Sequence, residues 1–243
     1  MRKLLLLISL ILPTLVGAIP MEIENATETA SPFPNAKKGI NILPLKEINI
    51  PAPMKNQILR NKGSLTANGY EDTTDTDENV LSLFKLQRNA KEEISKFDDS
   101  KNPYDTHLKS SVSKLDLAFN FQNIPGVQKK NIIGYAAVGG YVKGKGWDGV
   151  VEFISNPKFG ICSYTTYKIE KAILDKETTE YLVNKKPSNK SVAGNWNVGF
   201  LYTVNWYIPD RLMSFECANK MFDPVIINDM IALANHIDKQ RNK

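Results

Sequence analysis

The stretch FLYTVNWYIPDRLMSFECA, residues 200–218, decides the fold class. Apolar residues recur at every second position of its first half, as they do along a half-buried strand. Pro209 and Asp210 then mark a turn, and a second apolar strand pattern runs from Leu212 to Ala218. The two halves are therefore predicted to pair as an antiparallel hairpin.

Further strand patterns precede this hairpin and are separated by turn residues. They cover residues 115–122, 132–142, 150–155 and 159–169. Residues 170–183 fit a short helix or another strand, and residues 185–197 are polar and are expected to form a loop. The central part of the chain is thus dominated by strands.

A helix is expected on each side of these strands. Capping residues from Thr74 to Asp77 precede a helical pattern of about 20 residues that ends before Pro103. At the other end, Asp223 is placed to cap a final helix and Pro224 fits its first position. This arrangement predicts an α+β fold, with an antiparallel sheet of about five to seven strands in meanders or hairpins, flanked by an N-terminal and a C-terminal helix.

Residues 1–18 have the pattern of a cleavable signal peptide: Arg2 and Lys3, an apolar run over 4–12, and small residues up to Ala18. We therefore expect an exported protein, periplasmic or extracellular. The apolar run is too short to cross a membrane, which takes about 20 residues, and no later stretch replaces it, so no transmembrane segment is expected. A lipid anchor is not expected either, because the first cysteine is Cys162.

The mature chain divides into two parts. Residues 19–75 are rich in Pro and Asn and are expected to form a flexible, extended tail or linker, with an edge strand lying across the domain as the alternative. Residues 76–243 are expected to form a single α+β domain. The chain's two cysteines, Cys162 and Cys217, predict one disulfide in an oxidising compartment. The alternative is that one of the two cysteines is a thiol nucleophile.

Motifs for catalysis, cofactors and metals are weak. Gly144 to Gly149 have the spacing of a dinucleotide fingerprint, but a strand rather than a helix follows them, so the motif is rejected and no cofactor is expected. Neither His107 nor His236 has a neighbour at metal-ligand spacing, so no metal is expected. We assign no catalytic residue, although carboxylates could still converge in the fold, as Asp148 with Glu152 or Glu216.

Two tryptophans are the most suggestive residues for binding. Trp147 and Trp196 are predicted in loops with polar flanks, and Lys143 and Lys145 lie next to the first. If the loops share one end of the sheet, they form a basic aromatic surface for a protein, a glycan or an anionic envelope component. The alternative is that each tryptophan covers its own loop. Nucleic acid is not expected, because the net charge of +5 falls by two when the signal is removed.

These patterns favour an exported, soluble binding or interaction protein whose ligand the sequence does not identify. Catalysis is left open and is the less favoured interpretation. The alternatives are a hydrolase of envelope or extracellular polymers, acting through carboxylates that meet only in the fold, and a structural subunit of an envelope assembly. Oligomeric state is not indicated.

Overall fold

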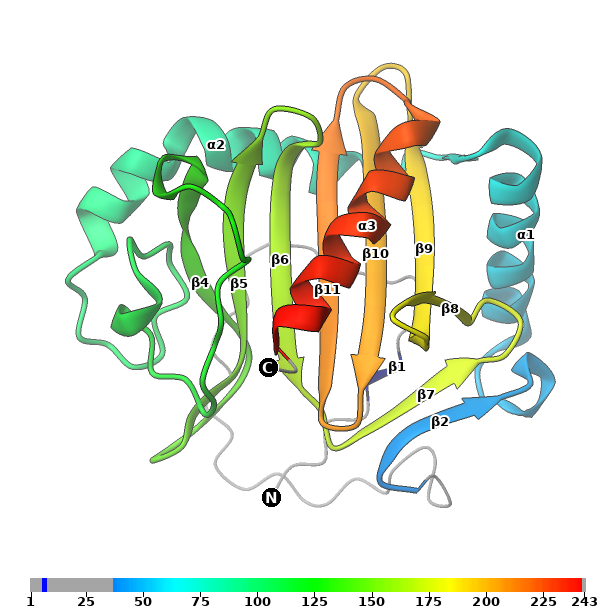
Figure 1. Ribbon diagram of the computed structural model, residues 1–243, viewed down its shortest axis with the longest axis horizontal. Helices are drawn as coiled ribbons and strands as arrows, with labels where there is room; N and C mark the ends of the chain where they lie inside the picture. Colours follow the sequence, from blue (N-terminus) through cyan, green and yellow to red (C-terminus); the bar gives the residue numbers. More distant parts are fainter. Residues whose placement is uncertain (1–5, 8–36, 242–243) are drawn as a thin grey trace.

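A computed structural model describes residues 6–7 and 37–241 of the 243-residue chain (Figure 1). The predicted signal peptide and the first part of the predicted tail lie outside the described residues, apart from the two residues of strand β1 (Leu6–Leu7). Within the described part of the chain, no helix is both long and apolar enough to cross a membrane.

The main sheet has eight strands and is mostly antiparallel, which confirms the predicted α+β fold. Its order is β3-β9-β10-β11-β6-β5-β4, and β8 pairs with β9. The strands are β3 (Glu71–Asp72), β4 (Ile132–Val142), β5 (Gly146–Asn156), β6 (Gly160–Lys168), β8 (Glu180–Val183), β9 (Lys186–Asn195), β10 (Gly199–Ile208) and β11 (Arg211–Asn219). Only the short β3 runs parallel to its neighbour.

The hairpin predicted from residues 200–218 is present as β10 and β11. Ile208 pairs with Arg211, so the turn is formed by Pro209 and Asp210. Side chains of β10 are almost all buried, because helices and strands cover both faces of the sheet at this point.

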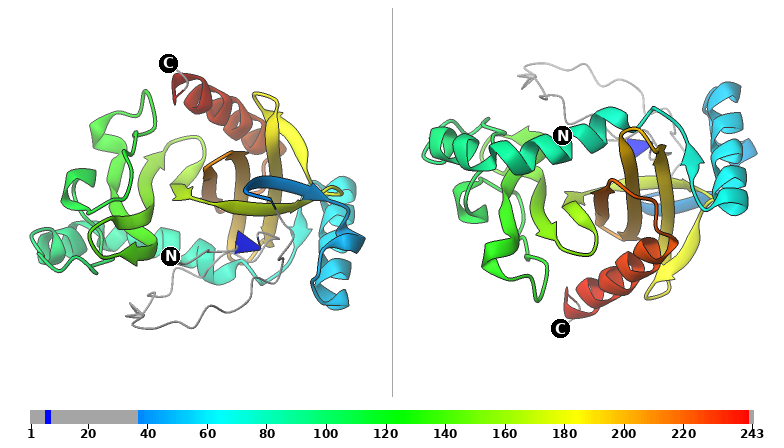
Figure 2. Two further views of the ribbon diagram at one scale, coloured as in Figure 1. Left: turned by 90° about the horizontal axis from the view of Figure 1, so that it is seen from below. Right: turned by 90° about the horizontal axis from the view of Figure 1, so that it is seen from above.

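Two helices cover opposite faces of the main sheet (Figure 2). Helix α2 (Asp77–Phe97) buries Val80, Leu83 and Ala90 against one face. Helix α3 (Pro224–Arg241) packs Ile226, Met230, Ala234 and Ile237 on the other face, over a larger core that contains Trp206 and the two cysteines. Both helices were predicted from their apolar spacing and capping residues.

A second, smaller sheet lies across the α2 face of the main sheet, at the end formed by the β10–β11 turn. It consists of β1, β7 (Lys171–Asp175) and β2 (Gly39–Leu43), all parallel. Because β1 belongs to the predicted signal peptide, the predicted mature chain keeps only β7 and β2 of this sheet. Ile40 and Ile42 pack there with Tyr207 and Leu212 of the hairpin. The alternative prediction, in which the tail lies across the domain as an edge strand, therefore describes residues 39–43.

The segment expected as a flexible tail also contains a long helix, α1 (Ala52–Asn68), so the expectation of an unstructured linker is wrong for residues 39–72. Its prolines suggested an extended chain, but Pro51 and Pro53 stand at the N-terminal end of α1, where a missing N–H costs nothing. Only Ile58 is fully buried, so the helix carries no broad apolar stripe. Gly69, with a φ of 78°, ends it.

Two local expectations in the centre of the chain are also wrong. Residues 115–122 form an irregular loop with a single bridge from Leu117 to Trp147 instead of a strand. The alternation there reflects loop packing: Phe121 contacts Tyr164, and Arg211 lies over the ring of Phe119. Residues 186–195, expected as a loop, form β9, since pairing with β10 overrides their polar composition.

Candidate functional site

Trp147 is a packing residue. It lies in β5 rather than in a loop, its side chain is only 5% exposed, and its Nε1 donates a hydrogen bond of 2.9 Å to the Pro103 carbonyl oxygen. Its ring centroid is 5.5 Å from that of Tyr141. Lys143 and Lys145 are exposed in the adjoining turn between β4 and β5.

Trp196 has the opposite environment. It lies in the turn between β9 and β10 and is 57% exposed. Strand register places this turn at the end of the sheet opposite to the β4–β5 turn, because Gly199 pairs with Asn195 whereas Ile208 pairs with Arg211 at the Trp147 end. The structure therefore does not bring Trp147 and Trp196 together, and no shared basic aromatic surface forms.

Trp196 instead belongs to a surface that the sequence analysis missed. Its ring lies edge-on to Phe200 with centroids 5.1 Å apart, and Phe200 in turn contacts Phe222 and Tyr70 at 5.6 and 5.1 Å. Two exposed apolar side chains lie close to Phe222 along the chain, Met221 at 62% and Val225 at 52%. We call this surface the aromatic end; it consists of Tyr70, Trp196, Met221, Phe222 and Val225.

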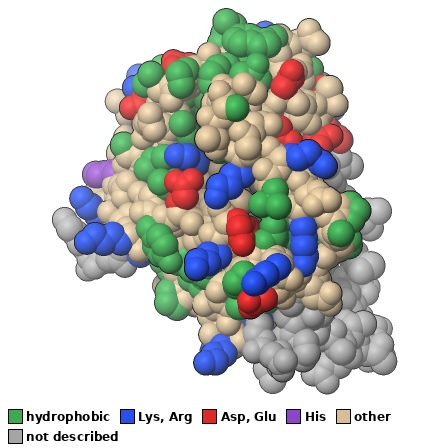
Figure 3. All heavy atoms as spheres, turned by 90° about the vertical axis from the view of Figure 1, so that its right-hand side faces the viewer, with side chains coloured by type: hydrophobic (Ala, Val, Ile, Leu, Met, Phe, Trp, Pro, Cys, Tyr) green, Lys and Arg blue, Asp and Glu red, His purple; other side chains and the backbone are tan. Residues whose placement is uncertain are grey.

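Hydrophobic side chains gather at the upper end of the face that carries α1 (Figure 3). Three connections between elements meet there: α1 to β3, β9 to β10, and β11 to α3. No local sequence pattern links these connections, because their residues are about 25 to 150 positions apart along the chain. The aromatic residue in each connection is the one feature of the sequence that pointed to this surface.

Hydrogen bonds hold this surface in a fixed shape. The Asn195 side-chain oxygen accepts hydrogen bonds from the N–H groups of Asn197 and Val198. Its Nδ2 donates a hydrogen bond of 2.7 Å to Asp77 Oδ1 at the start of α2. Below Met221, the Tyr202 hydroxyl donates to the Met221 carbonyl oxygen and accepts from the N–H of Asp223 at 2.6 Å. The exposed tryptophan therefore lies on a well-braced turn.

Cys162 and Cys217 form the predicted disulfide, and both are fully buried. A thiol nucleophile is excluded, because the described chain has no free cysteine. The bond joins two neighbouring strands of the main sheet and lies in the core beneath α3.

The carboxylates that the sequence left open as a pair have different roles. Glu152 accepts hydrogen bonds from the Ile124 N–H at 2.9 Å and from the Tyr135 hydroxyl at 3.4 Å, and it thus fixes the loop before β4. Glu216 lies on the opposite face of the sheet, since it pairs with Ser163 while Glu152 pairs with Tyr164. The structure therefore separates Glu152 from Glu216.

Asp148 and Glu216 both influence Tyr167. Burial, followed by the charges of Glu216 and Asp148, raises the pKa of Tyr167 to about 12. Burial also raises the pKa of Glu216 to about 7, although a hydrogen bond from Ser214 lowers it in part. Burial raises the pKa of Asp148 as well. Neither carboxyl group lines the cavity beside α1 or the cavity beside Trp147.

Within residues 6–7 and 37–241, no group of three or more His, Cys, Asp and Glu side chains is arranged to hold a metal ion. His107 stacks on Phe97 at 3.6 Å and bonds to the Asp105 carboxylate at 2.6 Å, so it braces the loop after α2. His236 bonds to Gln240 on the exposed side of α3.

No family model matches the chain, and neither the curated proteins nor the solved structures contain a significant match to it.

Proposed function

We propose that the chain is an exported binding protein that engages a partner protein through the aromatic end. The observation that carries this proposal is Trp196, 57% exposed on a braced turn with the Phe200 ring beneath it. Exposing a tryptophan and its aliphatic neighbours to water is unfavourable, and binding a partner relieves that cost. Export rests on the signal-peptide pattern, and a buried disulfide fits an oxidising compartment.

A protein fits this surface better than a glycan or an anionic envelope component. Tryptophan, tyrosine, phenylalanine and methionine are the side chains enriched in the centres of protein interfaces. Met221 and Val225 add aliphatic area that a sugar ring does not use. The two charged residues in this part of the β11–α3 connection, Lys220 and Asp223, have opposite signs and give no net attraction for an anion.

Photo-crosslinking tests the proposal. A photoreactive phenylalanine analogue is placed at position 196, and the protein is produced in the cells that normally make it. The matched control carries the analogue at Tyr181, which is 60% exposed on β8, near the opposite end of β9. We expect one protein adduct from position 196 and none from position 181.

Purified partner then provides the quantitative test. Trp196→Ala should weaken its binding by about 2 kcal/mol or more, which is roughly 30-fold, as for other central aromatic residues of interfaces. Tyr181→Ala should leave the affinity unchanged. Equal adducts from both positions, or unchanged affinity of Trp196→Ala, would reject the aromatic end as the docking surface. Sequencing the mature N-terminus tests export, with Ile19 as the expected first residue.

A further inference from the structure

An acidic segment adjoins the aromatic end. Residues 71–78, EDTTDTDE, contain five acidic residues and no basic one. They form β3, the turn that follows it and the first residues of α2. The exposed members, Asp72, Asp75 and Glu78, form no ion pair with another residue of the described ranges. Their negative charge is therefore open to a partner.

Strand pairing fixes this segment beside the turn between β9 and β10. Asp72 pairs with Gly194 on β9, and Gly194 pairs in turn with Phe200 on β10. Because Gly194 has no side chain, no β9 side chain separates Asp72 from Phe200 in this row. One residue further on, the Asn195 Nδ2 donates a hydrogen bond of 3.1 Å to the Thr73 carbonyl oxygen. The acidic segment is thus held against the turn that carries the exposed tryptophan.

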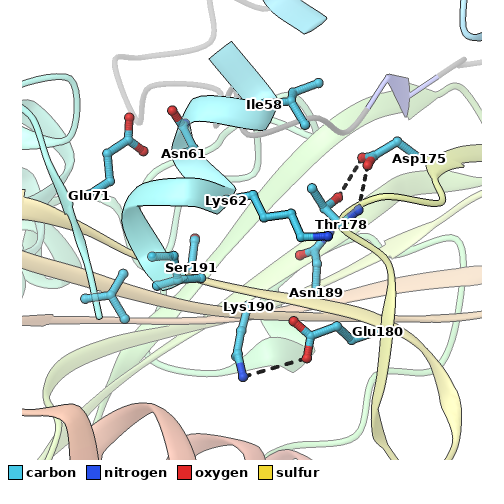
Figure 4. A pocket seen from close by; sticks show the side chains of 12 residues that line it. Ile58, Asn61, Lys62, Glu71, Asp175, Thr178, Glu180, Asn189, Lys190 and Ser191 are labelled. Carbon is cyan, nitrogen blue, oxygen red and sulfur yellow. Dashed lines mark hydrogen bonds and ion pairs between the residues drawn. The ribbon is translucent and has the colours of Figure 1, made fainter. Parts of the chain in front are cut away.

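The two acidic residues of β3 face different surfaces. Asp72 shares the face of Phe200, because residues directly opposite each other in a sheet point to the same side. Glu71 points to the other side, since successive side chains of a strand alternate. There it lines the cavity beside α1, whose lining also includes Lys62 and Lys190 (Figure 4). Asp72 therefore belongs to the surroundings of the aromatic end, and Glu71 does not.

Exposed carboxylates border the aromatic end on two sides. On one side, Asp77 accepts a hydrogen bond from Asn195, which places its neighbours along the chain beside the β9–β10 turn. On the other side, the β11–α3 connection contributes one exposed carboxylate directly after Phe222. We call these exposed side chains the acidic rim: Asp72, Asp75, Glu78 and Asp223.

Two members of the acidic rim have no structural role that accounts for them. Glu78 lies in the first turn of α2, and Asp223 accepts from the N–H of Val225 at the start of α3, so both stabilise a helix N-terminus. The side chains of Asp72 and Asp75, by contrast, make no hydrogen bond within the described part of the chain. These two carboxylates are the ones to vary in a test.

Positive charge is scarce at this end of the molecule. Lys220 is the only basic residue in the three connections that meet there, and its Nζ lies over the Phe84 ring of α2, 6.0 Å from the centroid. Lys158, in the nearby β5–β6 turn, forms an ion pair of 2.5 Å with Asp229 of α3. Acidic side chains lie among the hydrophobic ones at the upper end of the face that carries α1, whereas Lys and Arg predominate over its lower half (Figure 3).

We propose that the partner segment that docks on the aromatic end is basic, with apolar side chains on the exposed rings and lysine or arginine side chains against the acidic rim. This inference rests on the proposed function and adds the chemistry of the partner to it. Complementary charge speeds association and disfavours acidic competitors. Arginine suits the surface best, because a guanidinium group stacks on an indole such as that of Trp196 and also pairs with carboxylates.

Selection from a random peptide library displayed on phage tests this inference. The bait is the purified protein with its disulfide intact, and a parallel selection uses Trp196→Ala. We expect the peptides enriched by the wild type alone to carry a net positive charge together with apolar side chains. Nonspecific attraction to a chain of net charge +5 would favour acidic peptides instead, so the enrichment of basic ones reports the local charge of the aromatic end.

Charge variants then measure the contribution of the acidic rim to the binding of the tightest selected peptide. Asp72→Asn/Asp75→Asn should weaken this binding by roughly fivefold or more, mainly through slower association, and the difference should shrink in high salt. The matched control is Glu170→Gln/Asp210→Asn, which removes the same charge from exposed positions at the opposite end of the sheet. It should bind the peptide like the wild type.

The outcomes separate this inference from the proposed function. Selected peptides that need Trp196 but carry no net positive charge would overturn the basic partner and keep the aromatic end as the docking surface. Equal affinity of the two double variants would have the same consequence. A selection that enriches no peptide dependent on Trp196 would also overturn the inference, while photo-crosslinking from position 196 decides the proposed function independently.

Discussion

Cys162 and Cys217 lie directly opposite each other on β6 and β11, and their disulfide crosses between two adjacent strands of the main sheet. They are 55 residues apart along the chain. The bond therefore closes a large loop containing β6 to β11, including the small-sheet strand β7 and both strands of the β8–β9 hairpin.

Removing this bond should destabilise the protein substantially. A cross-link over a loop of this length reduces the entropy of the unfolded chain, which corresponds to about 4 kcal/mol of stabilisation. We expect Cys162→Ala/Cys217→Ala to lose roughly that free energy of unfolding in urea titrations, together with a smaller packing loss. Wild-type protein whose disulfide is reduced in the presence of urea is the control, because it loses the cross-link but keeps both cysteine side chains. Mass spectra of non-reduced peptides should show the two cysteines linked, and a pair of alkylated free thiols would contradict the structure.

The two tryptophans predicted to share a surface should respond differently to truncation. Trp147→Ala removes a buried ring and its hydrogen bond to Pro103, and should cost about 3–5 kcal/mol. Trp196→Ala removes a mostly exposed ring and one edge-on contact, and should cost about 1 kcal/mol or less. Urea unfolding of both variants checks this difference. Similar losses in the two variants would mean that one environment is misassigned.

Glu216 should make stability depend on pH. It is 8% exposed, and Ser163 and Thr203 are its direct cross-strand neighbours. Burial raises its pKa from 4.5 to about 7, so between these values the folded state holds a proton that the unfolded state releases. The free energy of unfolding should therefore fall as pH rises from 4.5 to 7, and this contribution should level off above pH 7.

Glu216→Gln isolates this effect, because glutamine resembles the protonated carboxyl group and stays neutral. At pH 8 the variant should be more stable than the wild type by up to about 3 kcal/mol, and at pH 4 the two should be nearly equal. Glu180→Gln, which removes a carboxyl group that is 46% exposed, is the control. Wild-type and Glu216→Gln curves that stay parallel from pH 4 to pH 8 would contradict the assignment.

The elements predicted correctly are those whose pattern is local. The β10–β11 hairpin and helix α3 each carry their own alternation, turn or cap, as with Asp223, whose side chain accepts from the Val225 N–H at 2.8 Å. Strand β9 could not be predicted in this way. Its polar residues from Ser188 to Ser191 become a strand because β10 pairs with them along their whole length. Helix α1 was missed because it covers an edge and buries little of its surface.

The candidate sites depend still more on tertiary structure. Trp196 was singled out from the sequence, but Tyr70 and Phe222, which contact the same Phe200 ring, come from connections far away in the sequence. Likewise, Lys62 and Lys190 line one cavity only because α1 packs beside the edge of the sheet at β9. A single sequence contains the residue types of such sites, whereas their convergence is a property of the fold.

The turn between β8 and β9 allows a prediction in the stabilising direction. Val183 pairs with Lys186, so Asn184 and Lys185 form a two-residue turn, and both have positive φ, 45° and 62°. Hairpin turns of this kind favour Asn followed by Gly, because a lysine in the left-handed region costs about 1 kcal/mol. Lys185→Gly should therefore raise the free energy of unfolding by roughly 0.5–1 kcal/mol.

Asn184→Gly is the matched control at the other turn position. Glycine also suits that backbone, but the Asn184 side chain donates to the Asn235 carbonyl oxygen at 2.9 Å and to Asp238 at 2.7 Å, which ties the hairpin to α3. Losing these two bonds should outweigh the relief of backbone strain, so Asn184→Gly should be destabilising. Urea unfolding of the two variants measures the opposite signs directly. A destabilised Lys185→Gly would mean that the lysine side chain contributes more to the folded state than its strained backbone costs.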